Sequence, residues 1–282
     1  MLKSLFVSDL HGSTHRYKKL LEFIFLEKPD AVFIGGDILP SGFRGESPVD
    51  FIEETVISNF LVLKRSMREK YPAVFIILGN DDSKRDENKI IMAEKKGLWS
   101  YSHNKKIVFK GRTVFGYSYI PPTPFLLKDW EKYDVSRYVD PGCISPEEGI
   151  RTYDQEPEVA RNTTIKKDLE KMFSEEDVSD HIMLFHTPPY KTALDRAALD
   201  GKFYDSAPLD VHVGSIAVRE FIEEKQPFLT LHGHIHESAR ITGSWRDRIG
   251  RTEMFSAAHD GKELAAVVFD IDDPTTAERY LI

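Results

Sequence analysis

The chain has 282 residues, of which 41% are hydrophobic and 11% aromatic, a composition typical of a globular protein with a substantial core. The formal net charge of −8 disfavours a long nucleic acid as the main partner, because phosphate backbones are bound by clustered Lys and Arg. Cys143 is the single cysteine, which excludes an intrachain disulfide and a cysteine-rich zinc site. No run of about 18 apolar residues occurs, so we expect a soluble, cytoplasmic protein without a membrane span.

Short apolar runs alternate with helical patterns along the chain. The runs typical of buried strands, rich in Val, Ile and Phe and ending in Gly or polar residues, are 2–8, 31–36, 73–79, 181–186 and 227–233. Apolar residues at helical spacing are Tyr17, Leu20, Leu21 and Ile24 after an N-cap at Ser13 or Thr14, then Val56, Phe60, Leu63 and Met67, then Val218, Phe221 and Ile222 after Ser215. The alternation predicts an α/β layered fold with the five strands in one main sheet.

Three further runs, 113–120, 252–258 and 264–271, read as strands with little helix between them. They predict a second, more antiparallel sheet packed against the first. No convincing linker interrupts the chain, so we expect a single domain over residues 1–282.

Two long stretches, 121–160 and 187–213, lack a regular pattern. Loops of this length in a compact domain are usually functional or disordered. The first contains Trp130, Tyr133 and Tyr138 and is a candidate lid insertion, although these aromatic side chains could equally pack beneath a long loop.

Each strand assigned to the main sheet ends in side chains that are able to bind a metal ion. In chain order these are Asp9 and His11, then Asp37, then Asn80, Asp81 and Asp82, then His186, then His234 and His236. The carboxyl ends of parallel strands meet in one crevice of an α/β sheet, so five segments deliver ligands to one place. In extended backbone, residues i and i+2 point the same way, so Asp9 and His11 can reach one ion together.

Each residue has a plainer explanation when it is taken alone. Asp9 could cap the following helix, Asp37 and Asn80 could be turn residues, and His186 could be a hydrogen-bonded core histidine. The His259–Asp260 pair lies outside the pattern and reads as a turn. Metal binding is favoured because the polar residues occur together, in order, at the ends of successive strands.

The ordered motifs D-x-H, G-D, G-N, a lone H and G-H-x-H, between residues 9 and 236, resemble the calcineurin-like metallophosphoesterase family. The resemblance implies a two-sheet β-sandwich flanked by helices, in four α/β/β/α layers, and two bound metal ions. The ligands that it implies are Asp9, His11, Asp37 and His236 for one ion, and Asp37, Asn80, His186 and His234 for the other. Imidazole, carboxylate and amide ligands suit Mn, Fe, Zn, Ni or Co better than Ca or Mg, with Mn favoured.

The implied activity is hydrolysis of a small phosphoester, with a nucleotide-like phosphodiester favoured over a monoester. Two ions would convert a bridging water to hydroxide, polarise the phosphoryl oxygens and hold the phosphorus in line, while Asn80 also orients the phosphate. The alternative is a non-catalytic metal-binding scaffold with the same fold. Amidohydrolases also use an H-x-H pair, but at the first strand, where this chain has D-x-H.

The chain departs from the family pattern at Asp81, where many members carry a catalytic histidine. A carboxyl group there serves as a general acid only if its pKa is raised, and it could instead have a structural role. Asp82 is expected to support neighbouring groups. His212 and His103 are other candidate acids, although each reads better as a surface or hydrogen-bonded histidine. His232 is expected to lie in the core or to support the ligands.

Overall fold

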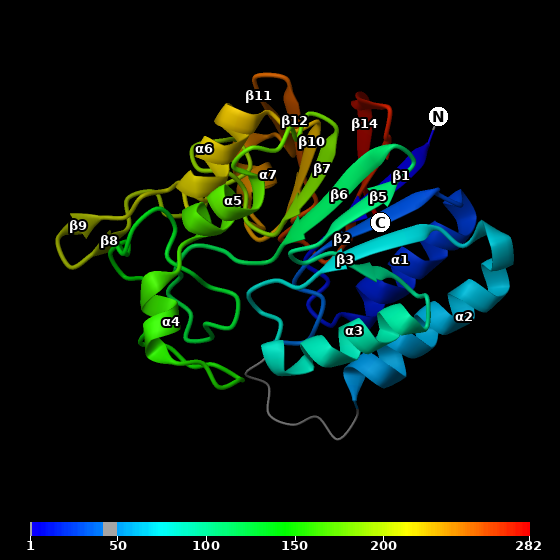
Figure 1. Ribbon diagram of the computed structural model, residues 1–282, viewed down its shortest axis with the longest axis horizontal. Helices are drawn as coiled ribbons and strands as arrows, with labels where there is room; N and C mark the ends of the chain where they lie inside the picture. Colours follow the sequence, from blue (N-terminus) through cyan, green and yellow to red (C-terminus); the bar gives the residue numbers. More distant parts are fainter. Residues whose placement is uncertain (1, 42–49) are drawn as a thin grey trace.

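Two six-stranded β-sheets pack face to face, and helices cover the outer face of each sheet (Figure 1). The computed structural model describes residues 2–41 and 50–282. The four layers confirm the helix-flanked two-sheet sandwich that the sequence predicted.

The first sheet has the strand order β14-β13-β1-β2-β3-β4. Its strands are β1 (Lys3–Val7), β2 (Ala31–Gly35), β3 (Ala73–Ile77), β4 (Ser100–Tyr101), β13 (Ala265–Asp270) and β14 (Asp273–Leu281). Strands β1 to β4 run parallel to one another, whereas β13 is antiparallel to β1 and β14 is antiparallel to β13. The parallel strands therefore all end at the same edge of the sheet.

The second sheet has the strand order β11-β12-β10-β7-β6-β5. Its strands are β5 (Lys106–Phe109), β6 (Arg112–Tyr117), β7 (His181–Phe185), β10 (Leu229–His232), β11 (Arg246–Ile249) and β12 (Thr252–Ser256). The four central strands are parallel, and only the edge strands β5 and β11 pair antiparallel with their neighbours. A short separate hairpin joins β8 (Phe203–Tyr204) to β9 (Ala207–Pro208).

The predicted division of strands between the sheets is wrong in two respects. The runs 181–186 and 227–233 form β7 and β10 in the second sheet, not in one main sheet with β1 to β3, and the run 264–271 forms β13 in the first sheet. The second sheet is also mainly parallel rather than more antiparallel. A strand buried on both faces has the same apolar pattern in either sheet, so that pattern carries no information about its partners.

The three helices that apolar spacing predicted, around residues 17–24, 56–67 and 218–222, are confirmed, and four more are present among the described residues. They are α1 (Thr14–Glu27), α2 (Ser58–Met67), α3 (Glu87–Lys95), α4 (Pro157–Asn162), α5 (Ile165–Phe173), α6 (Ile216–Lys225) and α7 (Ser238–Thr242), with a π-helical turn η1 (Ile52–Ile57) before α2 and 3₁₀ turns η2 (Arg68–Lys70) and η3 (Lys84–Asp86). The predicted N-caps Ser13 and Ser215 are confirmed, because each hydroxyl accepts a backbone N–H from the first turn of its helix. No helix in the described part of the chain is long and apolar enough to cross a membrane.

Aromatic side chains fill the space between the two sheets. Phe33 of β2 stacks on Phe75 and Phe269, with ring centroids 5.2 and 6.1 Å apart, and Phe255 of the second sheet meets Phe269 edge-on at 5.6 Å. Successive residues of β1 point to opposite faces, so Phe6 enters this inter-sheet core while its neighbours pack beneath the helices. The packing holds the two sheets at a fixed separation and brings their strand ends together.

The segment 121–160 is held down by buried side chains. Trp130 and Tyr133 are buried, as the packing alternative predicted, whereas Tyr138 is 68% exposed. Lys128 and Glu131 form an ion pair at 2.6 Å, and neither side chain has any exposed surface. The backbone N–H of Thr123 also donates to the Glu131 carboxylate, at 2.8 Å. Whether the segment acts as a lid stays a prediction.

We predict that Lys128→Met destabilises the protein by about 3–5 kcal/mol, because it leaves the Glu131 carboxylate buried without a cation. Urea unfolding followed by circular dichroism measures the change. The double variant Lys128→Met/Glu131→Gln removes both charges and should recover much of the loss. A single variant within about 1 kcal/mol of the wild type would contradict this account of the pair.

Candidate metal centre

The seven predicted ligands lie together at one end of the sandwich. In one group, Asp9, His11, Asp37 and His236 each present a ligand atom, and these atoms all lie within 4.8 Å of one another. In a second group, Asp37, His186 and His234 do the same. Asn80 joins the second group through its Oδ1 atom, 3.1 Å from Nε2 of His186. Asp37 therefore belongs to both groups, and each group contains the residues that the sequence assigned to one ion. Whether they bind metal stays a prediction.

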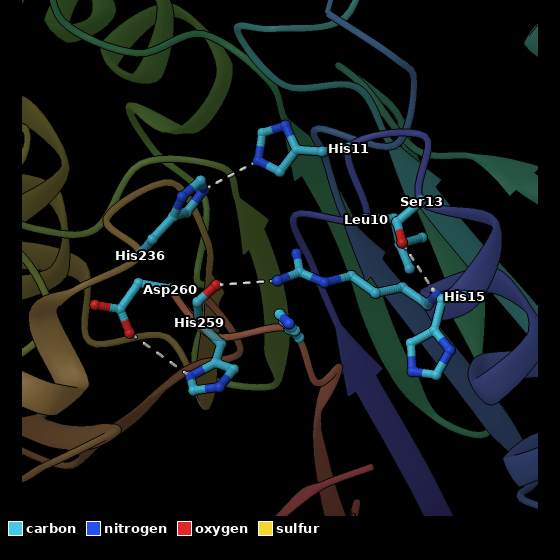
Figure 2. Close-up of a pocket in the computed structure, with 9 residues that line it drawn as sticks. Leu10, His11, Ser13, His15, His236, His259 and Asp260 are labelled. Atoms are coloured by element: carbon cyan, nitrogen blue, oxygen red, sulfur yellow. Dashed lines mark hydrogen bonds and ion pairs between the residues drawn. The ribbon is translucent and has the colours of Figure 1, made fainter.

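In the first group, the imidazole rings of His11 and His236 meet edge to face beside buried carboxylates. Nε2 of His11 lies 3.0 Å from Nε2 of His236, as Figure 2 shows, and 3.9 Å from Oδ2 of Asp37. Nε2 of His236 lies 3.3 Å from Oδ1 of Asp9, which also accepts the backbone N–H of His234 at 3.0 Å. Nitrogen and oxygen ligand atoms thus converge on one small volume.

In the second group, backbone contacts orient the ring of His186. Its Nδ1 lies 2.8 Å from the carbonyl oxygen of Gly35, so its Nε2 points toward Asn80 and lies 3.3 Å from Oδ2 of Asp37. Gly79 allows the chain to pass close to this ring, because a Cβ atom there would collide with the Asp37 carboxylate and the His186 ring.

The backbone carrying the ligands is not extended, so that part of the prediction is wrong. Asp9, His11, Asp37 and His234 all have left-handed φ values, of 57°, 45°, 50° and 71°. Each strand ends before its ligands, and the chain then turns. A hydrogen bond joins the turns after β1 and β2, because the backbone N–H of His11 donates to the carbonyl oxygen of Asp37 at 2.7 Å. This bond contributes to stabilising the left-handed conformations.

The charges in this cluster favour ionised carboxylates. Burial opposes ionisation of Asp9, but its hydrogen bond from His236 and the nearby imidazoles outweigh burial and lower its pKa. Burial likewise opposes the charged form of His11 and His186, but nearby carboxylates raise the pKa of each to about 9. These are Asp81, Asp37 and Asp9 for His11, and Asp37 and Asp9 for His186. At pH 7 the ionised carboxylates of Asp9 and Asp37 are thus balanced by protonated His11 and His186, which must release their protons when a metal ion binds.

Burial dominates at His234. Its desolvation, together with the positive charge of His186, lowers the pKa of His234 to about 3. The ring is therefore neutral near pH 7, the form in which imidazole binds a metal.

Asp81 faces the ligand His11. Its Oδ2 lies 3.2 Å from Nδ1 of His11, and its backbone N–H donates to Oδ1 of Asp37 at 2.8 Å. A carboxylate at Nδ1 holds the ring with Nε2 directed toward the ligand group. Asp81 is therefore placed to orient a ligand.

Asp82 joins the turns after β2 and β3. Its buried carboxylate accepts the backbone N–H groups of Gly79, Ile38 and Leu39, at 2.8, 3.1 and 2.7 Å. Burial, reinforced by the charge of Asp37, raises its pKa to about 7. These contacts give Asp82 the supporting position that the sequence predicted, because they connect the backbone around Asp37 with the backbone around Asn80.

Three further histidines are hydrogen-bonded, as the plainer interpretation predicted. His103 accepts the backbone N–H of Ser118 at 3.1 Å, and burial lowers its pKa well below the usual value. Nδ1 of His212 lies 2.7 Å from the buried carboxylate of Asp195. His232 is fully buried in β10, with its ring nitrogens 2.7 and 2.9 Å from oxygens of Thr230 and Thr187. None belongs to either ligand group in the described part of the chain.

The segment 121–160 is fastened to the chain just after Asn80. The buried carboxylate of Asp129 accepts the backbone N–H groups of Lys84 and Thr152, at 2.7 and 2.8 Å. The ammonium group of Lys84 lies 4.4 Å from the Trp130 ring centroid and donates to the Tyr119 hydroxyl at 2.7 Å. The segment thus contributes to fixing the turn that carries Asn80 and Asp81.

An open pocket of about 660 Å³ adjoins the first ligand group (Figure 2). Its lining residues are Leu10, His11, Ser13, His15, Arg16, His236, His259, Asp260 and Lys262. No sequence motif associates residues 259–262 with the ligands. Pairing of β13 with β1 places this segment beside Asp9, and the sequence carries no motif from which that pairing could be inferred.

Comparisons with known proteins agree with the geometry. The calcineurin-like phosphoesterase family matches residues 2–238, whereas no curated protein matches the sequence significantly. One crystal structure has 17% identity and a TM-score of 0.62, covering 99% of this chain and 98% of the other. The crystal structure of TT1561 of Thermus thermophilus has 16% identity and a TM-score of 0.57, with the same coverage. Both likenesses support the fold. Because the family match spans most of the chain and includes all seven clustered residues, this protein belongs to the calcineurin-like phosphoesterase family.

Proposed function

We propose that this protein hydrolyses a small phosphodiester, of the nucleotide-like class, with two bound divalent metal ions. Family membership supports a hydrolase that uses divalent metals. The observation that carries the finer proposal is that Asp37 belongs to two adjacent groups of potential ligands. A carboxylate with two oxygen atoms at this position can contact two ions at once.

The donor atoms fit divalent transition metals. Imidazole nitrogens, carboxylate oxygens and one amide oxygen suit Mn, Fe, Zn, Ni or Co, and we place Mn first. Contacts outside the ligand groups support the fit, because the Gly35 carbonyl orients His186 and the Asp81 carboxylate orients His11. The ligands we propose are the seven residues named above.

When bound, two such ions would supply an activated water and positive charge at the phosphoryl group. Asn80 directs its Oδ1 toward the second ligand group, which leaves its amide N–H groups to donate to a phosphate oxygen. The turn carrying Asn80 is held by Asp82 from one direction and by Asp129 from another. The chain thus pre-positions the group that orients the phosphate.

We propose that Asp81 acts by positioning His11 rather than by protonating the leaving group. The support is the contact between its carboxylate and Nδ1 of His11. A cytoplasmic location also stays a proposal, supported by the presence of a single cysteine.

The first prediction from the proposed function concerns the hydrolytic activity. Metal-free protein reconstituted with Mn²⁺ should hydrolyse bis(p-nitrophenyl) phosphate, and His234→Ala should lower kcat/KM by at least about 100-fold, because the second ion loses a ligand. The variant His212→Asn provides a control that changes a histidine outside both ligand groups and outside the adjoining pocket. Absence of turnover by the metal-loaded wild type on a panel of mono- and diesters would favour the scaffold alternative.

The second prediction separates the two roles of Asp81. If Asp81 positions His11, then Asp81→Asn should weaken metal binding by about tenfold and reduce kcat by one factor for aryl esters of every leaving-group pKa. A general acid behaves differently, because its removal costs more as the leaving group becomes more basic. A loss that grows with leaving-group pKa would contradict the positioning role. Saturation with Mn²⁺ should restore part of the activity of the variant.

The third prediction concerns stability and pH without metal. The folded-state pKa values of His11 and His186 are about 9, above the ordinary value of 6.5. The stability that they contribute is therefore complete below about pH 6.5 and is lost as pH rises through about 9. The Tm of chelator-treated protein should fall over this range, and saturating Mn²⁺ should reduce the fall. A metal-free Tm that rises from pH 6.5 to 9 would contradict this description of the cluster.

A further inference from the structure

Apart from His11 and His236, the residues that line the open pocket belong to neither ligand group. We propose that the pocket binds a second anionic group of the substrate, such as a phosphate or carboxylate, and that Lys262 is the cation that recognises this group. The inference rests on the proposed function, and it narrows the substrate class to esters that carry a negative charge beyond the phosphoryl group being cleaved.

The position of the pocket makes it continuous with the first ligand group. His11 and His236 line one part of it (Figure 2). The rest is lined by Leu10, Ser13, His15, Arg16, His259, Asp260 and Lys262. Its volume of about 660 Å³ falls within the range of small-molecule sites. A substrate whose phosphoryl group lies at the ligands can therefore extend its remaining part into this pocket.

Arg16 holds the pocket at a fixed place relative to the ligands. Its guanidinium donates to the carbonyl oxygen of Asp9, to that of Gly261 at 2.7 Å and to that of His259 at 3.3 Å. These bonds join the first ligand residue to the segment that carries Lys262. Because both terminal nitrogens of its guanidinium donate to backbone oxygens, Arg16 has a positioning role, whereas no side-chain partner is present for the ammonium group of Lys262 among the described residues.

The charges around Lys262 favour an anion. Asp260, the one carboxylate of the lining, is paired with Arg240 at 2.7 Å, and the neighbouring Glu263 lies 3.3 Å from Nε2 of His259. Among residues 2–41 and 50–282, no carboxylate forms an ion pair with Lys262. Its ammonium group can therefore donate to a ligand without first breaking an ion pair in this part of the chain.

The lining also argues against a nucleobase in this pocket. Bases commonly stack on Phe, Tyr or Trp, and the described residues that line the pocket include none of these. The charged rather than the aromatic part of a nucleotide-like substrate is thus the better occupant.

A matched pair of non-hydrolysable ligands tests the inference by binding alone. Titration calorimetry on the full, Mn²⁺-loaded chain compares propylphosphonate with the bisphosphonate in which a second phosphonate ends the same three-carbon chain. We expect the bisphosphonate to bind about tenfold more tightly, the size of one charged hydrogen bond. Lys262→Met should reduce this advantage to about threefold or less, and so should Lys262→Gln. Lys18→Met, which removes an exposed cation of α1 outside the pocket lining, should keep it.

The outcomes separate this inference from the proposed function. Equal binding of the two phosphonates by the wild type, or an undiminished advantage in both Lys262 variants, overturns the inference while hydrolysis of bis(p-nitrophenyl) phosphate still supports the enzyme. Loss of the advantage in Lys18→Met as well as in the Lys262 variants also overturns it, because the effect is then one of general charge. If neither phosphonate binds and no ester is hydrolysed, both the inference and the proposed function fail.

Discussion

The candidate metal centre depends on the buried carboxylate of Asp37. It lies at the end of β2, faces ligand atoms contributed by both sheets, and accepts the backbone N–H of Asp81. A buried carboxylate needs charged or hydrogen-bonding partners to offset its desolvation. Its partners here, the imidazoles of His186 and His11, themselves come from different sheets. Satisfying this one charge therefore requires the two halves of the sandwich to meet at the same end.

The core between the two sheets fixes the position of one sheet relative to the other. Aromatic packing between the sheets, centred on Phe33 and Phe269, fixes their separation, and parallel strands in each sheet point their carboxyl ends the same way. Hydrogen bonds then connect the turns that follow these strands. The carboxylate of Asp82 accepts backbone N–H groups from the turn after β2 and from the turn after β3. The strands thus place the turns close together, and buried hydrogen bonds between the turns fix the final positions of the candidate ligands.

The ligand set could be predicted from sequence because each member follows a recognisable strand and a short motif, as in GHIH around His234 and His236. Two features could not. The apolar pattern of a strand indicates that it is buried but not which strands it pairs with, so β7 and β10 were predicted in the wrong sheet. The left-handed backbone at Asp9 and His11 arises from bonds to the neighbouring turn, a tertiary effect that overrides the local expectation of extended chain. The pocket residue Lys262 follows no motif and is placed only by the pairing of β13 with β1.

The surroundings of the centre differ on its two sides, and the difference has a functional consequence. On the side of Asn80, the buried Asp129 and the ring of Trp130 fasten the turn, so substitutions there would disturb the side chain that we propose to orient the phosphate. On the side of His236, the pocket is open and Lys262 is exposed. Substitutions in residues 259–262 alter charge and shape without removing a ligand. We therefore expect the catalytic chemistry to be set by the rigid side and the choice of substrate by the open one, since selectivity for a distal group needs contacts that the reacting atoms do not use.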